Sequence, residues 1–107
     1  MTFEEYQQFV EKNVGDKKLD VVFQTLGLCG EAGEVAEKVK KILRDENGVF
    51  SDEAKQEIAK ELGDVLWYIA RAGMEIGVNM EDIVRINVEK LLSRVERGTV
   101  FGKGDNR

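Results

Sequence analysis

The sequence contains no histidine, no proline and a single cysteine, Cys29. Without histidine the chain cannot build a histidine-ligated metal site, a histidine general base or a Ser-His-Asp triad. A lone cysteine cannot form an internal disulfide, and no signal peptide or long apolar run is present, so we expect a cytoplasmic protein without a membrane partner. The absence of proline is typical of long, uninterrupted helices.

Basic residues are outnumbered, with 16 Lys and Arg against 21 Asp and Glu, which gives a formal net charge of −5. Proteins that bind nucleic acid generally present a basic surface, so this charge argues against a general nucleic-acid binder. It is compatible with a small phosphate-bearing ligand whose charge a metal ion neutralises. At 107 residues, 42% of them hydrophobic, we expect one domain, residues 1–107, with a single core.

Apolar residues recur at helical spacing in the first half of the chain. Thr2 and Glu5 form a capping box that begins the first helix, and Gly15 ends it. A second helix is predicted to begin near residues 16–19 and to run to about Arg44. It carries glycines at every third position, Gly27, Gly30 and Gly33. This spacing indicates close approach to another helix, although each glycine costs the helix roughly 1 kcal/mol relative to alanine.

Two further helices are predicted in the second half. Ser51 caps a helix that runs to about Ile76, and Asn79 caps a fourth helix that ends at a glycine-rich tail from Gly98. Beyond its core stripe the third helix is apolar on most sides, through Leu66, Trp67, Ala70 and Met74. The fourth has a predicted core stripe of Val84, Val88, Leu91 and Val95. The fold class is therefore an all-α bundle of four main helices, and the apolar breadth of the third predicts a subunit interface.

Two pairs of acids, Glu31 with Glu34 and Glu61 with Asp64, stand on the second and third predicted helices. Acids three residues apart share one helix face, so two antiparallel helices can bring all four carboxylates to one point. Gathering unpaired charge is costly, and oxygen-only ligands favour a hard cation such as Mg²⁺ or Mn²⁺. The alternative is a solvated acidic face.

The segments LCGEAGEV (28–35) and ELGDVLW (61–67) resemble the MazG family of nucleoside triphosphate pyrophosphohydrolases, within the all-α NTP pyrophosphatase superfamily. Its signature is ExxE, a spacer and ExxD. The resemblance continues through 87–94 and 97–99 and so covers most of the chain. One position departs from the pattern: many members carry two adjacent acids at the start of the first motif, and Gly30 replaces the first of them here. This departure predicts a smaller ligand set in that motif.

The resemblance implies Mg²⁺-dependent hydrolysis of a nucleoside triphosphate between its α and β phosphates, giving the monophosphate and pyrophosphate, by a dimer or a tetramer made from dimers. Its catalytic and metal-binding residues would be the two acid pairs, Glu31, Glu34, Glu61 and Asp64. Its substrate-binding residues would be Asn87, Lys90 and Arg94, with the Lys and Arg as a phosphate clamp. A basic surface stripe paired with Glu89 or Glu96 is the alternative for these three. Because histidine is absent, any side-chain general base must be a carboxylate.

Two other functions stay open at this point. One is a related pyrophosphohydrolase with a narrower substrate, such as dUTP, dCTP or phosphoribosyl-ATP. The other is a non-catalytic helical interaction protein whose acids are only surface. Nucleotide turnover with and without Mg²⁺ separates the enzyme from the interaction protein.

Overall fold

The structure is a computed structural model that describes residues 1–15 and 19–107. It contains α1 (Phe3–Lys12), α2 (Val21–Asp45), α3 (Asp52–Glu75) and α4 (Met80–Glu96), and the described residues form no strand. The all-α class and the four main helices are therefore confirmed. In the same part of the chain, no helix combines the length and the apolar character needed to cross a bilayer.

Polar side chains cap the helices where the sequence predicted them. Thr2 and Glu5 form the capping box of α1, with the Glu5 amide donating to Thr2 Oγ1 at 3.1 Å. The Ser51 hydroxyl accepts from the amide of Ala54, and Asn79 forms a second capping box at the start of α4. Each side chain satisfies an amide that has no partner within the first turn of its helix.

The start of α2 differs from the prediction. Residues 16–18, where the start was expected, lie outside the described residues, and α2 itself begins at Val21. Asp20 is its N-cap, because its carboxylate accepts a hydrogen bond of 3.0 Å from the Phe23 amide. An aspartate directly before an apolar run is a good capping residue, so this start could have been read from the sequence.

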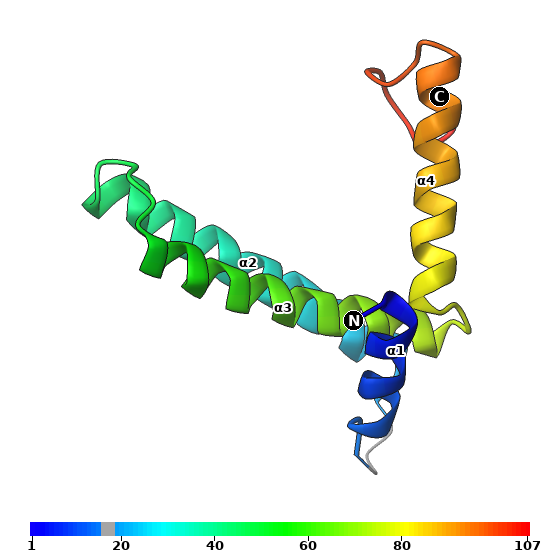
Figure 1. The fold of residues 1–107 in the computed structure, drawn as a ribbon, viewed down its shortest axis with the longest axis horizontal. Coiled ribbons are helices and arrows are strands. Elements are labelled where there is room, and N and C mark those ends of the chain that lie inside the picture. The colour runs from blue at the N-terminus through cyan, green and yellow to red at the C-terminus, as the bar shows by residue number, and fades with distance from the viewer. Residues whose placement is uncertain (16–18) are drawn as a thin grey trace.

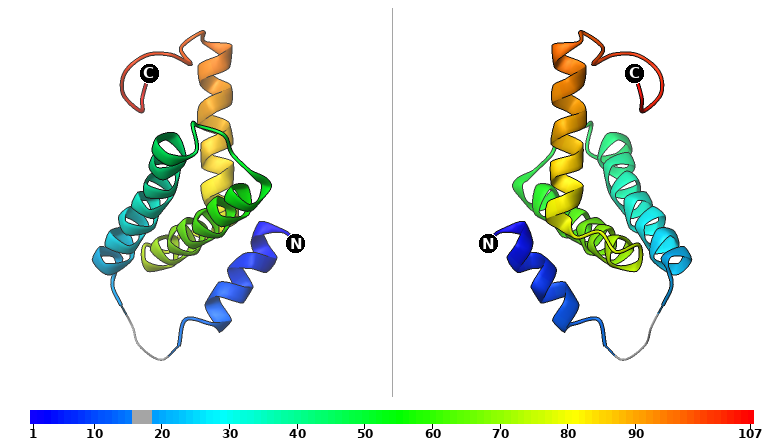
Figure 2. Two further views of the ribbon diagram at one scale, coloured as in Figure 1. Left: turned by 90° about the vertical axis from the view of Figure 1, so that its left-hand side faces the viewer. Right: turned by 90° about the vertical axis from the view of Figure 1, so that its right-hand side faces the viewer.

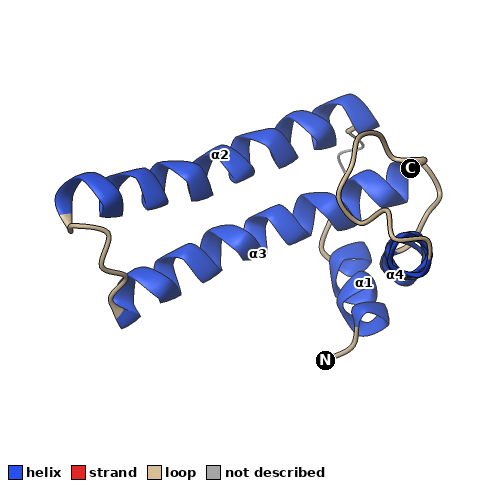
Figure 3. Cartoon of the chain, turned by 90° about the horizontal axis from the view of Figure 1, so that it is seen from above, coloured by secondary structure: helices blue, strands red, loops and turns tan. Residues whose placement is uncertain are grey.

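The two longest helices, α2 and α3, pack side by side and antiparallel (Figures 1 and 3). At one position their contact depends on the absence of a side chain. A Cβ atom added at Gly27 would meet the ring of Tyr68 with its nearest carbon 2.2 Å away, so only glycine fits under this ring. Gly30 and Gly33 face open space in this chain, so of the glycines predicted to allow close approach only Gly27 does so here.

The small core lies where α1, α3 and α4 meet, and its fully buried members are Val10, Ala70 and Met80. Partly buried apolar side chains pack around it: Tyr6, Val14, Leu66, Trp67, Ile69 and Met74. Leu66, Trp67 and Met74, part of the apolar breadth of α3, are therefore partly buried within the same chain. The subunit interface that this breadth predicted stays a prediction. Phe9 makes an edge-to-face contact with Trp67, with ring centroids 6.5 Å apart.

Helix α4 leaves this core and projects away from the α2–α3 pair (Figures 1 and 2). It packs against α1 and α3 and, within the described chain, makes no helix–helix contact with α2. One chain therefore does not close a four-helix bundle. The predicted core stripe of α4 is wrong for the single chain, because Val88, Leu91 and Val95 are 48%, 43% and 63% exposed. Among the described residues, no other helix covers this part of α4.

Candidate active site

Three carboxylates from two helices converge on the contact between α2 and α3. Glu31 comes from α2, and Glu61 and Asp64 come from α3, one turn apart. One oxygen atom of each lies within 4.8 Å of the others. Glu31 and Glu61 are half-buried and Asp64 is exposed, so the cluster is open to a ligand from solvent.

Glu34, the fourth predicted acid, does not belong to this group. Its side chain is exposed on α2, one turn beyond Glu31, and its oxygens lie outside the set that converges. Its role as a ligand stays a prediction.

The pKa of Glu31 is raised above its ordinary value of 4.5. Partial desolvation is the largest cause, followed by the negative charges of Asp64, Glu61 and Glu34 and a hydrogen bond with Glu61. Each cause disfavours the ionised form, so a cation among these oxygens would offset the repulsion. The donors are all hard oxygen atoms, which fits Mg²⁺ or Mn²⁺.

Two residues beside the carboxylates were not singled out from the sequence. Lys38 Nζ lies 3.7 Å from Glu61 Oε1 and 4.0 Å from Glu57 Oε2, so it reaches from α2 to the acids of α3. Lys38 lies seven residues after Glu31 and so on the same helix face. This spacing could have indicated from the sequence that Lys38 lies near the acids. Tyr6 on α1 has a pKa raised first by burial and then by the charge of Asp64. No local pattern in the sequence could have indicated that Tyr6 feels the charge of Asp64.

The predicted substrate-binding residues all stand on α4. Asn87 is exposed, Lys90 is half-buried, and Arg94 is buried with a side chain only 6% exposed. Because α4 makes no contact with α2 in the described chain, these residues are not gathered with Glu31 of the same chain. The acidic cluster and the predicted substrate-binding residues of α4 therefore lie apart in one chain.

The all-helical fold brings together three of the four carboxylates that the ExxE and ExxD motifs predicted to meet. The profile of the MazG nucleotide pyrophosphohydrolase domain matches residues 23–99, and the chain belongs to this family. The match contains both acid pairs and all three predicted substrate-binding residues of α4. Family membership implies hydrolysis of nucleoside triphosphates to release pyrophosphate, in general terms.

Two curated proteins are similar to the chain over most of its length. The chain is 48% identical over 85 residues to the Gene 37 protein of Mycobacterium phage L5, covering 79% of this chain and 75% of that protein. It is 40% identical over 74 residues to the uncharacterized protein YvdC of Bacillus subtilis strain 168, covering 64% of this chain and 70% of that protein. No solved structure matches the chain significantly.

Proposed function

We propose that this protein hydrolyses a nucleoside triphosphate between its α and β phosphates and releases the monophosphate and pyrophosphate. The observation that supports this most is the convergence of Glu31, Glu61 and Asp64 oxygens within 4.8 Å across the contact between α2 and α3. An exposed acidic face has no need to aim carboxylates from two helices at one another, since like charges repel. A site for a metal–triphosphate complex needs this arrangement, because the metal ion binds to several carboxylates at once.

The three carboxylates would hold Mg²⁺, with Mn²⁺ as a substitute. A bound divalent cation would neutralise phosphate oxygens and acidify a water molecule. Lys38 holds Glu61 through an ion pair and so restricts where that carboxylate points. Because the chain has no histidine, a carboxylate is the group available to accept the proton of the attacking water.

The test is a panel of ribo- and deoxynucleoside triphosphates incubated with the protein, with Mg²⁺ and with a chelator instead. We expect Mg²⁺-dependent formation of monophosphate and pyrophosphate in equal amounts from at least one member. Diphosphate and phosphate as products would mean cleavage at the other anhydride and would reject the proposal. The same panel identifies the base and sugar that the site prefers.

We further propose that the protein works as a dimer, or as a tetramer made from two dimers, in which a second copy supplies α4. The exposed part of α4 carries several large apolar side chains: Ile86, Val88, Leu91, Leu92 and Val95. Exposed apolar area on this scale favours association, at roughly 25 cal/mol per Å² buried. Lys90 and Arg94 lie on the same helix, and the acidic cluster of a neighbouring copy is their electrostatic complement.

Complementation tests this arrangement. Glu61→Gln removes a carboxylate and Lys90→Ala removes a cation, so each variant alone should have little activity. If one copy supplies acids and the other cations, mixed dimers contain one intact site of two, and random mixing restores about a quarter of the wild-type rate. No recovery on mixing, with confirmed subunit exchange, would show that each site is built within one chain.

A further inference from the structure

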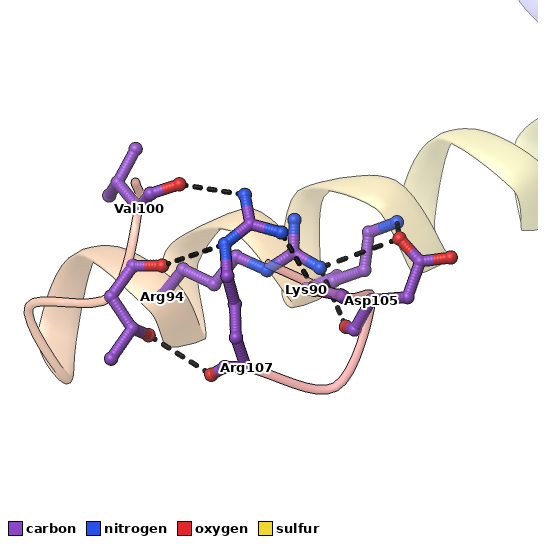
Figure 4. Close-up of polar contacts among 7 residues, drawn as sticks. Lys90, Arg94, Val100, Asp105 and Arg107 are labelled. Atoms are coloured by element: carbon purple, nitrogen blue, oxygen red, sulfur yellow. Dashed lines mark hydrogen bonds and ion pairs between the residues drawn. The ribbon is translucent and has the colours of Figure 1, made fainter. Parts of the chain in front are cut away.

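The segment after α4, residues 98–107, folds back onto the helix and contacts the two predicted clamp residues (Figure 4). Asp105 Oδ1 lies 3.5 Å from Lys90 Nζ and 3.7 Å from Arg94 Nη2. Arg94 Nη2 also donates a hydrogen bond of 2.6 Å to the backbone oxygen of Asp105. A single carboxylate is therefore shared by two cations one helical turn apart, as a phosphate group would be.

The loop that presents Asp105 is closed by its own hydrogen bonds. Arg107 donates to three backbone oxygens, those of Thr99, Val100 and Gly104, at 3.1, 2.7 and 2.7 Å. The Thr99 hydroxyl donates in return to the backbone oxygen of Arg107 at 3.0 Å. Gly104 has a φ of +83°, a conformation that favours glycine and that turns the chain just before Asp105. The carboxylate is thus placed by an ordered loop.

The contact of Asp105 with Lys90 and Arg94 is nevertheless one that a stronger anion can displace. The Asp105 side chain is 87% exposed, and ion pairs to exposed carboxylates contribute little to stability. Arg94 keeps unused donor capacity, because its buried Nε has no hydrogen-bond partner among the described residues. A polyphosphate offers several charged oxygens to the same two cations, where the tail offers one carboxylate and one carbonyl.

We infer that residues 98–107 are an acidic latch: Asp105 occupies the Lys90–Arg94 cation pair in the ligand-free protein and is displaced when the polyphosphate of the substrate binds. This inference rests on the proposed function for the identity of the ligand. It assigns Asp105 the role of an internal competitor, and opening of the loop becomes part of substrate binding. The latch also keeps two neighbouring cations from facing each other without an anion.

The first experiment measures binding of inorganic tripolyphosphate by calorimetry at low ionic strength with a chelator present. Asp105→Asn removes the competing charge at nearly constant shape, and Glu96→Gln removes the same charge from the exposed end of α4 as the matched control. We expect Asp105→Asn to bind about three- to fivefold more tightly than Glu96→Gln, the range that one or two exposed ion pairs account for. Equal or weaker binding by Asp105→Asn would overturn the latch.

The second experiment follows the loop itself through tryptic cleavage after Lys103, an exposed residue of the loop. We expect tripolyphosphate to speed this cleavage several-fold in the wild type, and Asp105→Asn to be cleaved quickly without it. Slower cleavage in the wild type with tripolyphosphate would show a tail that closes over the ligand, and would also overturn the latch. Neither readout requires turnover, so failure of the proposed reaction is recognised separately by the absence of pyrophosphate.

Discussion

Replacing Gly27 with alanine tests the position where the ring of Tyr68 on α3 packs directly against the backbone of α2. The new Cβ would lie 2.2 Å from the nearest Tyr68 ring carbon, so the ring or the helices must shift. Overpacking of this kind costs roughly 1–3 kcal/mol. Alanine in a helix returns about 1 kcal/mol relative to glycine, so the net loss of unfolding free energy is up to about 2 kcal/mol.

The matched control is Gly30→Ala on the same helix, where an added Cβ meets nothing within 4 Å. The gain in helix propensity is common to both variants, so their difference isolates the packing cost of roughly 1–3 kcal/mol. Urea unfolding at one fixed protein concentration measures it. Equal stability of the two variants would refute the close contact. When both variants also carry Tyr68→Leu, the stability difference between Gly27→Ala and Gly30→Ala should disappear, because the ring that the new methyl group meets is gone.

The remaining predictions concern the acids and the assembly. Glu34→Gln should leave metal-free stability unchanged or higher, weaken the Mg²⁺-dependent rise in Tm and lower turnover. If the variant instead loses stability but keeps its Mg²⁺-dependent rise in Tm and its turnover, Glu34 is not a metal ligand. Because the pKa of Glu31 is raised in the folded protein, the metal-free protein should lose stability as the pH rises above 4.5 through that folded-state pKa. Glu31→Gln should flatten this slope in melting curves recorded with a chelator. Sedimentation at micromolar concentration should show no dominant monomer, and a clean monomer would contradict the role given to α4.

Local features were readable from the sequence because their causes are local. Thr2, Ser51 and Asn79 cap helices through atoms three residues away, and each was identified by type and spacing. The shared face of Glu61 and Asp64 follows from helix geometry, and their meeting with Glu31 required only that two helices pack antiparallel.

Features that depend on the placement of whole elements were not predicted. The stripe of α4 that includes Leu91 has the periodicity of a core face but is exposed in the single chain. Apolar periodicity indicates that a helix face is buried, but it does not indicate whether the same chain or a second one buries it. Trp67 is part of the apolar breadth that predicted a subunit interface, and the structure places it against Phe9 of α1. The contact of Asp105 with Lys90 depends on a glycine-containing loop that has no hydrophobic period at all.

We propose that the carboxylates at the contact between α2 and α3 hold the metal ion on which pyrophosphate release depends. The most direct test measures pyrophosphate release and the Mg²⁺-dependent shift in Tm side by side for wild type, Glu61→Gln and Glu53→Gln. Glu53 is an exposed acid in the first turn of the same helix, so its variant controls for the change of charge. We predict that Glu53→Gln keeps both properties and that Glu61→Gln loses both. A Glu61→Gln protein that still releases pyrophosphate and still gains stability from Mg²⁺ would contradict the account.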